Sequence, residues 1–224
     1  MCMVAAAVSC AELPARRSPS LLLLAFFLTA CGSQPEPTPT PFDFYVLAIS
    51  WSPSYCAAEG ASANRRQCEA RPPHGFVVHG LWPQHEQGWP EFCAPGSEEW
   101  VADELARSML DIMPSSGLVG HQWRKHGYCS GLSQEDYFAL TRAAFERVAL
   151  PDPAPLAPLV DPVQLARMVR SANEGLEEGQ MAVTCDATYL REIRICITGK
   201  LDFRACPEVA ARACGLDQAR MPSP

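Results

Sequence analysis

The sequence predicts an α+β fold in a single disulfide-stapled domain, and three observations support this prediction. Segments typical of strands and of helices follow one another in mixed order, without the strict alternation of a parallel α/β sheet. The chain has 224 residues, 48% of them hydrophobic, which is enough for one domain with a real core and a tail. Eight of the 11 cysteines lie in that domain, and this even number is what a set of disulfides requires. We place it at residues 42–215, followed by a C-terminal tail at 216–224.

Four segments have the aromatic and β-branched composition of strands. They are residues 42–51, 75–79, 181–184 and 192–197. Three helices are predicted from apolar residues at helical spacing and from capping residues. The first begins at Ser97 and ends before Pro114, the second begins at Ser133 and continues to about residue 148, and the third begins after Asp161.

The first 30 residues are predicted to be a signal peptide. Arg16 and Arg17 precede an apolar run, residues 21–28, that is much shorter than the roughly 20 residues of a membrane span. Residues 28–31, Leu-Thr-Ala-Cys, resemble the bacterial lipobox, so we expect Cys31 to carry lipid after cleavage. An ordinary secretory signal with a coincidental cysteine is the alternative.

Residues 31–41 form a proline-rich tether after the cleavage site. Alternating proline makes such a segment a semi-rigid, extended spacer outside the fold. We therefore expect an exported protein of the periplasm or cell envelope, anchored to a membrane through lipid. Gly32 stands where an Asp often retains lipoproteins at the inner membrane, which favours the outer membrane.

The eight cysteines of the domain indicate four disulfides, because exported domains are commonly stapled in this way. The sequence alone leaves their pairing open. Zinc binding is the alternative, but no C-x-x-C pair occurs in the chain, and we expect no metal or cofactor. The net charge of −7 argues against a protein that coats long RNA, but it allows an enzyme with a small local cationic site.

Two stretches carry residues suited to chemistry. The first is His79-Gly80-Leu81-Trp82-Pro83, in which a histidine ends an apolar strand and Gly80 allows a sharp turn. Taken alone, His79 and Trp82 would more often be residues of the protein core.

The second stretch runs from His121 to Cys129. On a helix, His121, Gln122, Lys125 and His126 fall within an arc of roughly 140°. A solvated polar face is the ordinary interpretation, but four groups able to donate to an oxyanion on one face favour a site. The spacing of the two histidines differs from the i,i+4 pair of a zinc helix.

Together these stretches resemble the two active-site motifs of the ribonuclease T2 family, H-G-L-W-P and H-E-W-x-K-H-G-x-C. Residues 79–83 match the first, and residues 121–129 match the second except at Gln122. Residues 51–56 and 190–196 also resemble family segments, so the resemblance spans about 42–197. It implies a central antiparallel sheet flanked by helices and metal-independent cleavage of RNA through a 2′,3′-cyclic phosphate.

Roles follow from the resemblance by position. His79 and His126 would form the acid–base pair, with His126 favoured as the base, and Lys125 would stabilise charge on the phosphorane. His121 would bind phosphate and Trp82 would stack on a base. DNA lacks the 2′-hydroxyl and should be inert. The resemblance also implies disulfides Cys56–Cys68, Cys93–Cys129 and Cys185–Cys196, which leaves Cys206–Cys214.

Gln122 is the main departure from the family pattern, because the family has a carboxylate there. Its amide can still donate a hydrogen bond, so we expect activity to survive, with a pH optimum less acidic than in a relative that carries Glu. Gln84 follows the first motif where relatives often carry Asp, so no base preference is transferred. Two alternatives remain: a lipoprotein that binds RNA or a partner without catalysis, and a metal hydrolase using the three histidines. A monomer is the default.

Overall fold

A computed structural model describes residues 42–93, 99–152 and 156–224. The predicted signal peptide, the tether and Cys31 lie outside the described residues, as does Ser97. Within those three described ranges, no helix has the length and apolar character needed to cross a membrane.

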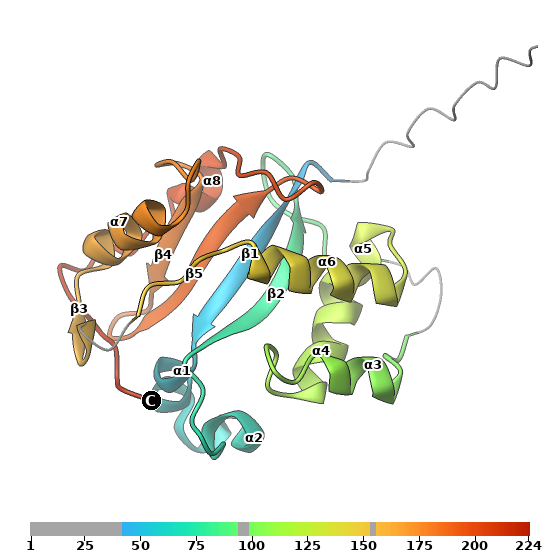
Figure 1. The fold of residues 1–224 in the computed structure, drawn as a ribbon, viewed down its shortest axis with the longest axis horizontal. Coiled ribbons are helices and arrows are strands. Elements are labelled where there is room, and N and C mark those ends of the chain that lie inside the picture. The colour runs from blue at the N-terminus through green and yellow to red at the C-terminus, as the bar shows by residue number, and fades with distance from the viewer. Residues whose placement is uncertain (1–41, 94–98, 153–155) are drawn as a thin grey trace, which may run out of the picture. The chain divides into compact units, whose positions relative to one another are not determined.

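Four strands form a central antiparallel sheet in the order β2-β1-β5-β4 (Figure 1). Their bounds are β1 Phe44–Trp51, β2 Phe76–Gln84, β4 Met181–Cys185 and β5 Leu190–Ile197. A second, two-stranded sheet pairs β3 (Leu159–Val160) with β6 (Ala219–Arg220). The α+β prediction and the central antiparallel sheet are confirmed.

Helices flank this sheet (Figure 1). The helical elements are α1 Ser52–Glu59, η1 Gly60–Ser62, α2 Arg65–Cys68, α3 Asp103–Ser108, α4 Ser116–Gln122, η2 Trp123–Gly127, α5 Tyr128–Ser130, α6 Gln134–Glu146, α7 Pro162–Ala172 and α8 Pro207–Ala210. Ser133 and Asp161 cap α6 and α7 by accepting backbone N–H bonds, as the sequence predicts.

The two faces of the sheet differ in character because side chains alternate along each strand. On β1, Tyr45, Leu47, Ile49 and Trp51 point into the main core, where they are at most 3% exposed. The opposite face carries Val46 of β1 beside Trp82 of β2, which is only partly buried. This second face holds the candidate site.

A β-bulge interrupts the pairing of β1 with β2 at His79. Ala48 pairs with Gly80 and the next residue, Ile49, pairs with Val78, so His79 is the extra residue. Regular alternation would put His79 on the face opposite to Gly80 and Trp82; the bulge brings it to the same face.

Two predicted boundaries were wrong. A helix was expected from Ser97 to before Pro114, but among the described residues of this range only Asp103–Ser108 is helical, and turns follow it. In these turns the Ile112 carbonyl accepts a hydrogen bond from Val78 N at 2.8 Å. That carbonyl therefore anchors β2. The strand expected at 75–79 continues to Gln84, so the first motif lies within a strand and Gly80 makes no turn.

The expected tail at 216–224 is also wrong, because this segment completes the fold. Its β6 pairs with β3, Met221 is fully buried, and the indole of Trp51 donates to the Pro222 carbonyl at 2.9 Å.

Four disulfides are present, and two of the expected pairings need correction. Cys56–Cys68 and Cys93–Cys129 are formed as expected. The other bonds are Cys185–Cys214 and Cys196–Cys206, instead of Cys185–Cys196 and Cys206–Cys214. The register of β4 with β5 explains this: Cys185 lies opposite Leu190, whereas Cys196 lies at the far end of the same hairpin. Cysteines so far apart cannot bond without moving the backbone.

Candidate active site

His79 projects from the bulge of β2 toward β5. Its Nδ1 lies 2.5 Å from Oε1 of Glu192, and its side chain is 39% exposed. The bulge therefore gives His79 a buried carboxylate partner on one side and access to solvent on the other.

Trp82, three residues further along β2, joins the strand to the helical segment. Its indole N–H donates to Oε1 of Gln122 at 2.8 Å, and Gln122 is only 1% exposed. A Cβ on Gly80 would overlap the Gln122 amide. Gly80 is thus required for close approach between β2 and the helix, a different role from the turn that the sequence suggested.

The second motif forms a continuous helical segment, α4–η2–α5, capped at its start by Ser115, whose Oγ accepts from Leu118 N. Its middle turn, η2, is π-helical, a feature often found at functional sites. Trp123 is 1% exposed and packs against Tyr137 and Phe138 in the core. The segment therefore buries Trp123 on one side, while His121, Gln122, Lys125 and His126 line a hollow on the other.

His126 is buried beside Trp82, with the two rings stacked and their centroids 5.4 Å apart. The residue is 5% exposed, and among the described residues no group hydrogen-bonds to its Nδ1. Burial, followed by the positive charges of Lys125, His79 and His121, lowers the pKa of His126 to about 3. His126 is therefore neutral over the physiological pH range.

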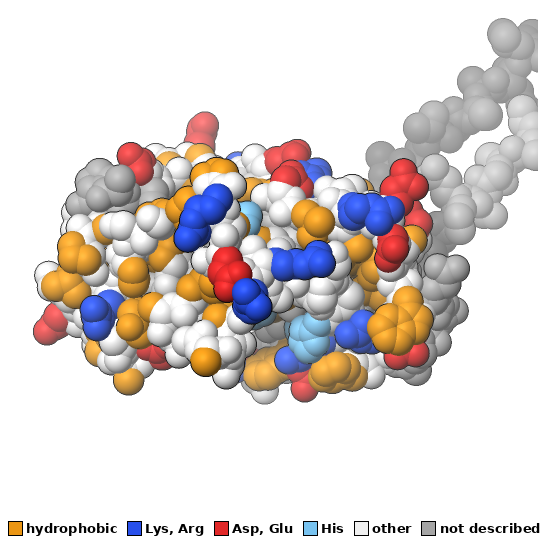
Figure 2. Space-filling model, turned by 90° about the horizontal axis from the view of Figure 1, so that it is seen from below, with side chains coloured by type: hydrophobic (Ala, Val, Ile, Leu, Met, Phe, Trp, Pro, Cys, Tyr) orange, Lys and Arg blue, Asp and Glu red, His pale blue; other side chains and the backbone are white. Residues whose placement is uncertain are grey.

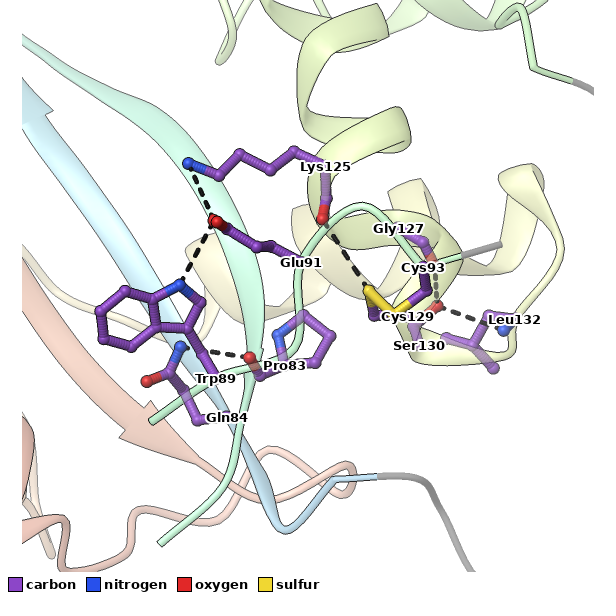
Figure 3. Close-up of a disulfide and its surroundings, with 10 residues drawn as sticks. All are labelled: Pro83, Gln84, Trp89, Glu91, Cys93, Lys125, Gly127, Cys129, Ser130 and Leu132. Carbon is purple, nitrogen blue, oxygen red and sulfur yellow. Dashed lines mark hydrogen bonds and ion pairs between the residues drawn. A yellow bond between two sulfur atoms is a disulfide. The ribbon is translucent and has the colours of Figure 1, made fainter. Parts of the chain in front are cut away.

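Lys125 and His121 supply positive or donating groups at the mouth of the site. Lys125 Nζ lies 3.3 Å from a carboxylate oxygen of Glu91, which also accepts from the Trp89 indole (Figure 3). Burial, and then the charges of Lys125 and other cations, lowers the pKa of His121. The Cys93–Cys129 disulfide, drawn in the same view, ties the segment carrying Glu91 to the helix carrying Lys125.

All six predicted polar and aromatic site residues line one hollow of about 230 Å³, here called the active-site hollow: His79, Trp82, His121, Gln122, Lys125 and His126. A second, adjoining hollow also reaches His79 and His121 and extends past Glu192, Ser50 and Tyr55. Two distant stretches of the chain, residues 79–83 and 121–129, therefore converge on one hollow.

Sequence reasoning missed several residues around these hollows. The sequence assigned no role to four residues that line the hollows: Glu192, Arg194, Trp89 and Arg212. The sequence carried little signal for Glu192, because β5 also holds Arg191 and Arg194; what sets Glu192 apart is its burial, at 7% exposure.

On the face shown in Figure 2, basic and acidic side chains are interspersed and form no broad basic patch. Within the described ranges, no three His, Cys, Asp or Glu side chains are arranged to hold a metal ion.

Comparison with known proteins identifies the family of the chain. The family described as the Ribonuclease T2 family matches residues 42–206. A ribonuclease of Aeromonas hydrophila is 34% identical over 186 residues, which cover 79% of this chain and 80% of that protein. A probable ribonuclease of Haemophilus influenzae is 34% identical over 124 residues, 50% of this chain and 45% of that protein.

Solved structures show the same fold. An RNase-related protein from Calystegia sepium superimposes with a TM-score of 0.61 at 20% identity, covering 81% of this chain and 97% of that one. RNase NT, solved in complex with 5′-AMP, gives 0.57 at 22% identity, covering 81% and 98%. The chain therefore belongs to the ribonuclease T2 family, and it is an endoribonuclease of that type.

Proposed function

We propose that this enzyme cleaves single-stranded RNA without a metal ion, by attack of the 2′-hydroxyl on the adjacent phosphorus. The product would be a 2′,3′-cyclic phosphate, which is then hydrolysed to a 3′-phosphate. The single observation that carries the proposal is the meeting of His79 and His126 in one hollow in different environments. One ring is held by a carboxylate, and the other is buried among cations.

In the first step, His126 takes the proton of the 2′-hydroxyl as the oxygen bonds to phosphorus. Its low pKa keeps it neutral and ready to accept a proton. His79, paired with Glu192, would give a proton to the departing 5′-oxygen. In the second step water enters, the two histidines exchange roles, and the bond from phosphorus to the 2′-oxygen breaks. Each positioned proton transfer contributes about 10²–10⁴ in rate.

Negative charge grows on the phosphorane oxygens during both steps. The ammonium of Lys125, the imidazole of His121 and the amide of Gln122 all line the same hollow and can stabilise that charge. Glu91, which pairs with Lys125 at 3.3 Å, would be displaced by the phosphate.

Nucleotides on either side of the cleaved bond would occupy the two hollows that meet at His79 and His121. Stacking on Trp82 would add roughly 1–3 kcal/mol with little discrimination between bases. We therefore propose low base specificity, and Gln84, which also lines the active-site hollow, carries no charge to impose a preference.

Digestion of RNA by purified protein in EDTA tests this function. Wild-type protein is expected to cleave, while His79→Ala and His126→Ala each lose at least about 100-fold in kcat. An oligonucleotide with 2′-deoxyribose throughout should stay intact. Full activity of either variant, or cleavage only after metal is restored, would overturn the proposal.

The alternative of a catalytically weakened RNA- or partner-binding protein rests on one observation, the neutral Gln122 where family members carry Glu. The same digestion separates it, because that alternative predicts RNA binding without cleavage. In either case we expect a monomer.

We further propose that the protein is exported, which its four disulfides favour. We also propose that Cys31 carries lipid and anchors the enzyme in the cell envelope. Labelling with a fatty-acid analogue should mark the wild-type protein but not Cys31→Ser. Labelling of both proteins alike would contradict this assignment.

A further inference from the structure

We propose that Glu192 is a positioning residue that holds His79 as the proton donor of the reaction. This inference rests on the proposed function, in which His79 protonates the departing 5′-oxygen. It assigns a role to strand β5, which carries Glu192 and places it against the Nδ1 side of the His79 ring.

The contact itself is short and specific. Glu192 Oε1 lies 2.5 Å from His79 Nδ1, and the two residues come from strands on opposite sides of β1. The bulge in β2 makes this reach possible, because it turns His79 to the face on which Glu192 lies. A carboxylate at Nδ1 requires a hydrogen on that nitrogen, which directs Nε2 away from Glu192 for proton transfer.

Arg194, two residues along β5, holds the other carboxylate oxygen. Its Nε and Nη2 lie 2.8 and 2.7 Å from Oε2 of Glu192. Burial on its own raises the pKa of Glu192, but the hydrogen bond from His79 and the charges of His79 and Arg194 lower that pKa to about 2. Glu192 is therefore ionised throughout the working pH range.

Other charged groups around His79 do not replace Glu192. On the helical segment, Lys125 carries a permanent positive charge, which disfavours a second positive charge nearby. The carboxylates of Glu59 and Glu208 line the two hollows, but they pair with Arg191 and Arg212. Among these groups, Glu192 is thus the carboxylate that contacts His79.

Glu192 and Arg194 also link His79 to Trp82, the side chain proposed to stack on a base. The guanidinium carbon of Arg194 lies 5.2 Å from the centre of the Trp82 ring. One carboxylate and one guanidinium therefore connect the proton donor to the aromatic side chain that would receive a base.

The test compares two substrates, one whose leaving group must be protonated by an acid and one whose leaving group needs no proton. RNA requires protonation of the 5′-oxygen, whereas a uridine 3′-(4-nitrophenyl phosphate) releases a phenolate that needs no proton. Glu192→Gln keeps an oxygen that can accept from His79 but removes the charge. On RNA we expect kcat to fall about 10–100-fold with little change in KM. The basic limb of the pH–rate profile should move about one unit or more to lower pH.

On the nitrophenyl substrate, Glu192→Gln should retain activity within about threefold of wild type, which also shows that the variant is folded. His79→Ala should show the same contrast between substrates. The matched control is Glu69→Gln, which removes an exposed carboxylate from an ion pair on the surface and should match wild type on both substrates.

The outcomes separate the two claims. If His79→Ala shows the contrast but Glu192→Gln does not, because it is fully active on RNA or equally impaired on both substrates, the role of Glu192 is wrong. If wild-type protein forms no cyclic phosphate or His79→Ala stays active on RNA, the proposed function fails, and the inference fails with it.

Discussion

At the scale of single residues, the site depends on giving two identical side chains opposite properties. His126 is buried among cations and has a pKa of about 3, whereas His79 is partly exposed and bonded to a carboxylate. Environments that separate two like groups in this way are how enzymes assign an acid and a base at one pH.

Gln122→Glu tests this separation directly. A carboxylate beside His126 favours the imidazolium, so the pKa of His126 should rise and the acidic limb of the pH–rate profile should move to higher pH. This direction is opposite to the one expected from the sequence, because a base with a lower pKa stays active in more acidic solution. Rates on RNA from pH 3 to 8 measure it.

The exposed Gln164→Glu on α7 is the matched control and should leave the profile unchanged. A profile of Gln122→Glu that is unchanged or shifted toward acid would show that residue 122 does not influence the base.

The sequence could predict which residues gather but not all of their partners. Helical spacing placed His121, Gln122, Lys125 and His126 on one face, and the structure brings all four to the hollow. The contact of His79 with Glu192 could not be predicted, because it joins residues 113 apart in the chain through a bulge.

At the scale of elements, β2 and the segment α4–η2–α5 must lie unusually close together. Gly80 allows this approach, and the Trp82–Gln122 hydrogen bond fixes it. A one-residue bulge then decides which face His79 occupies. The sequence motif H-G-L-W-P therefore forms a strand that has a bulge at His79 and that approaches Gln122 closely at Gly80.

Gly80→Ala should disturb the site more than the fold. Its Cβ would lie 2.5 Å from the Trp82 indole nitrogen and would overlap Gln122, so β2 and the helix must separate. We expect a loss of about 1–3 kcal/mol in the free energy of unfolding and at least a tenfold loss of kcat on RNA. Urea unfolding and steady-state rates measure the two effects.

Gly199→Ala is the control, since nothing lies within 4 Å of the position a Cβ would take there. Wild-type activity in Gly80→Ala would mean that the close approach is not needed for catalysis.

The corrected disulfides and the C-terminal segment show where local patterns stop being informative. The Cys185–Cys214 bond depends on the register of β4 with β5, and Met221 is buried through a pairing of β6 with the distant β3. Neither the register nor such long-range pairing leaves a periodic signal in the sequence. Caps at Ser133 and Asp161, which are local, were predicted correctly.

At the scale of the whole molecule, the catalytic arrangement makes the fold sensitive to acid. The pKa of His126 is about 3 in the folded protein and about 6.5 when unfolded, so the unfolded chain binds more protons between these values. The stability linked to His126 is fully present above about pH 6.5 and is lost as pH falls toward 3. Glu192, with a pKa of about 2, adds a loss as pH falls below about 4.5.

Urea unfolding at pH 7 and pH 4 should therefore show a decrease on the order of a few kcal/mol at the lower pH. In His126→Asn most of the decrease should disappear, while His85→Gln, at an exposed histidine, should behave as wild type. An equal pH dependence in His126→Asn and wild type would contradict the low pKa.

The net charge of −7 disfavours electrostatic attraction of the whole molecule to RNA. Basic and acidic side chains are interspersed on the face shown in Figure 2, whereas Lys125, Arg194 and Arg212 line the active-site hollow and can attract phosphate there. That arrangement suits cleavage of short exposed stretches of single-stranded RNA better than binding along a long duplex.

The central claim is that two histidines carry out 2′-hydroxyl attack on one phosphodiester without a metal. Phosphorus NMR of the products formed from RNA by purified enzyme in EDTA measures it most directly. We predict that 2′,3′-cyclic phosphate appears first and is then replaced by 3′-phosphate. Products ending in 5′-phosphate, or the absence of any cyclic phosphate at early times, would contradict the account.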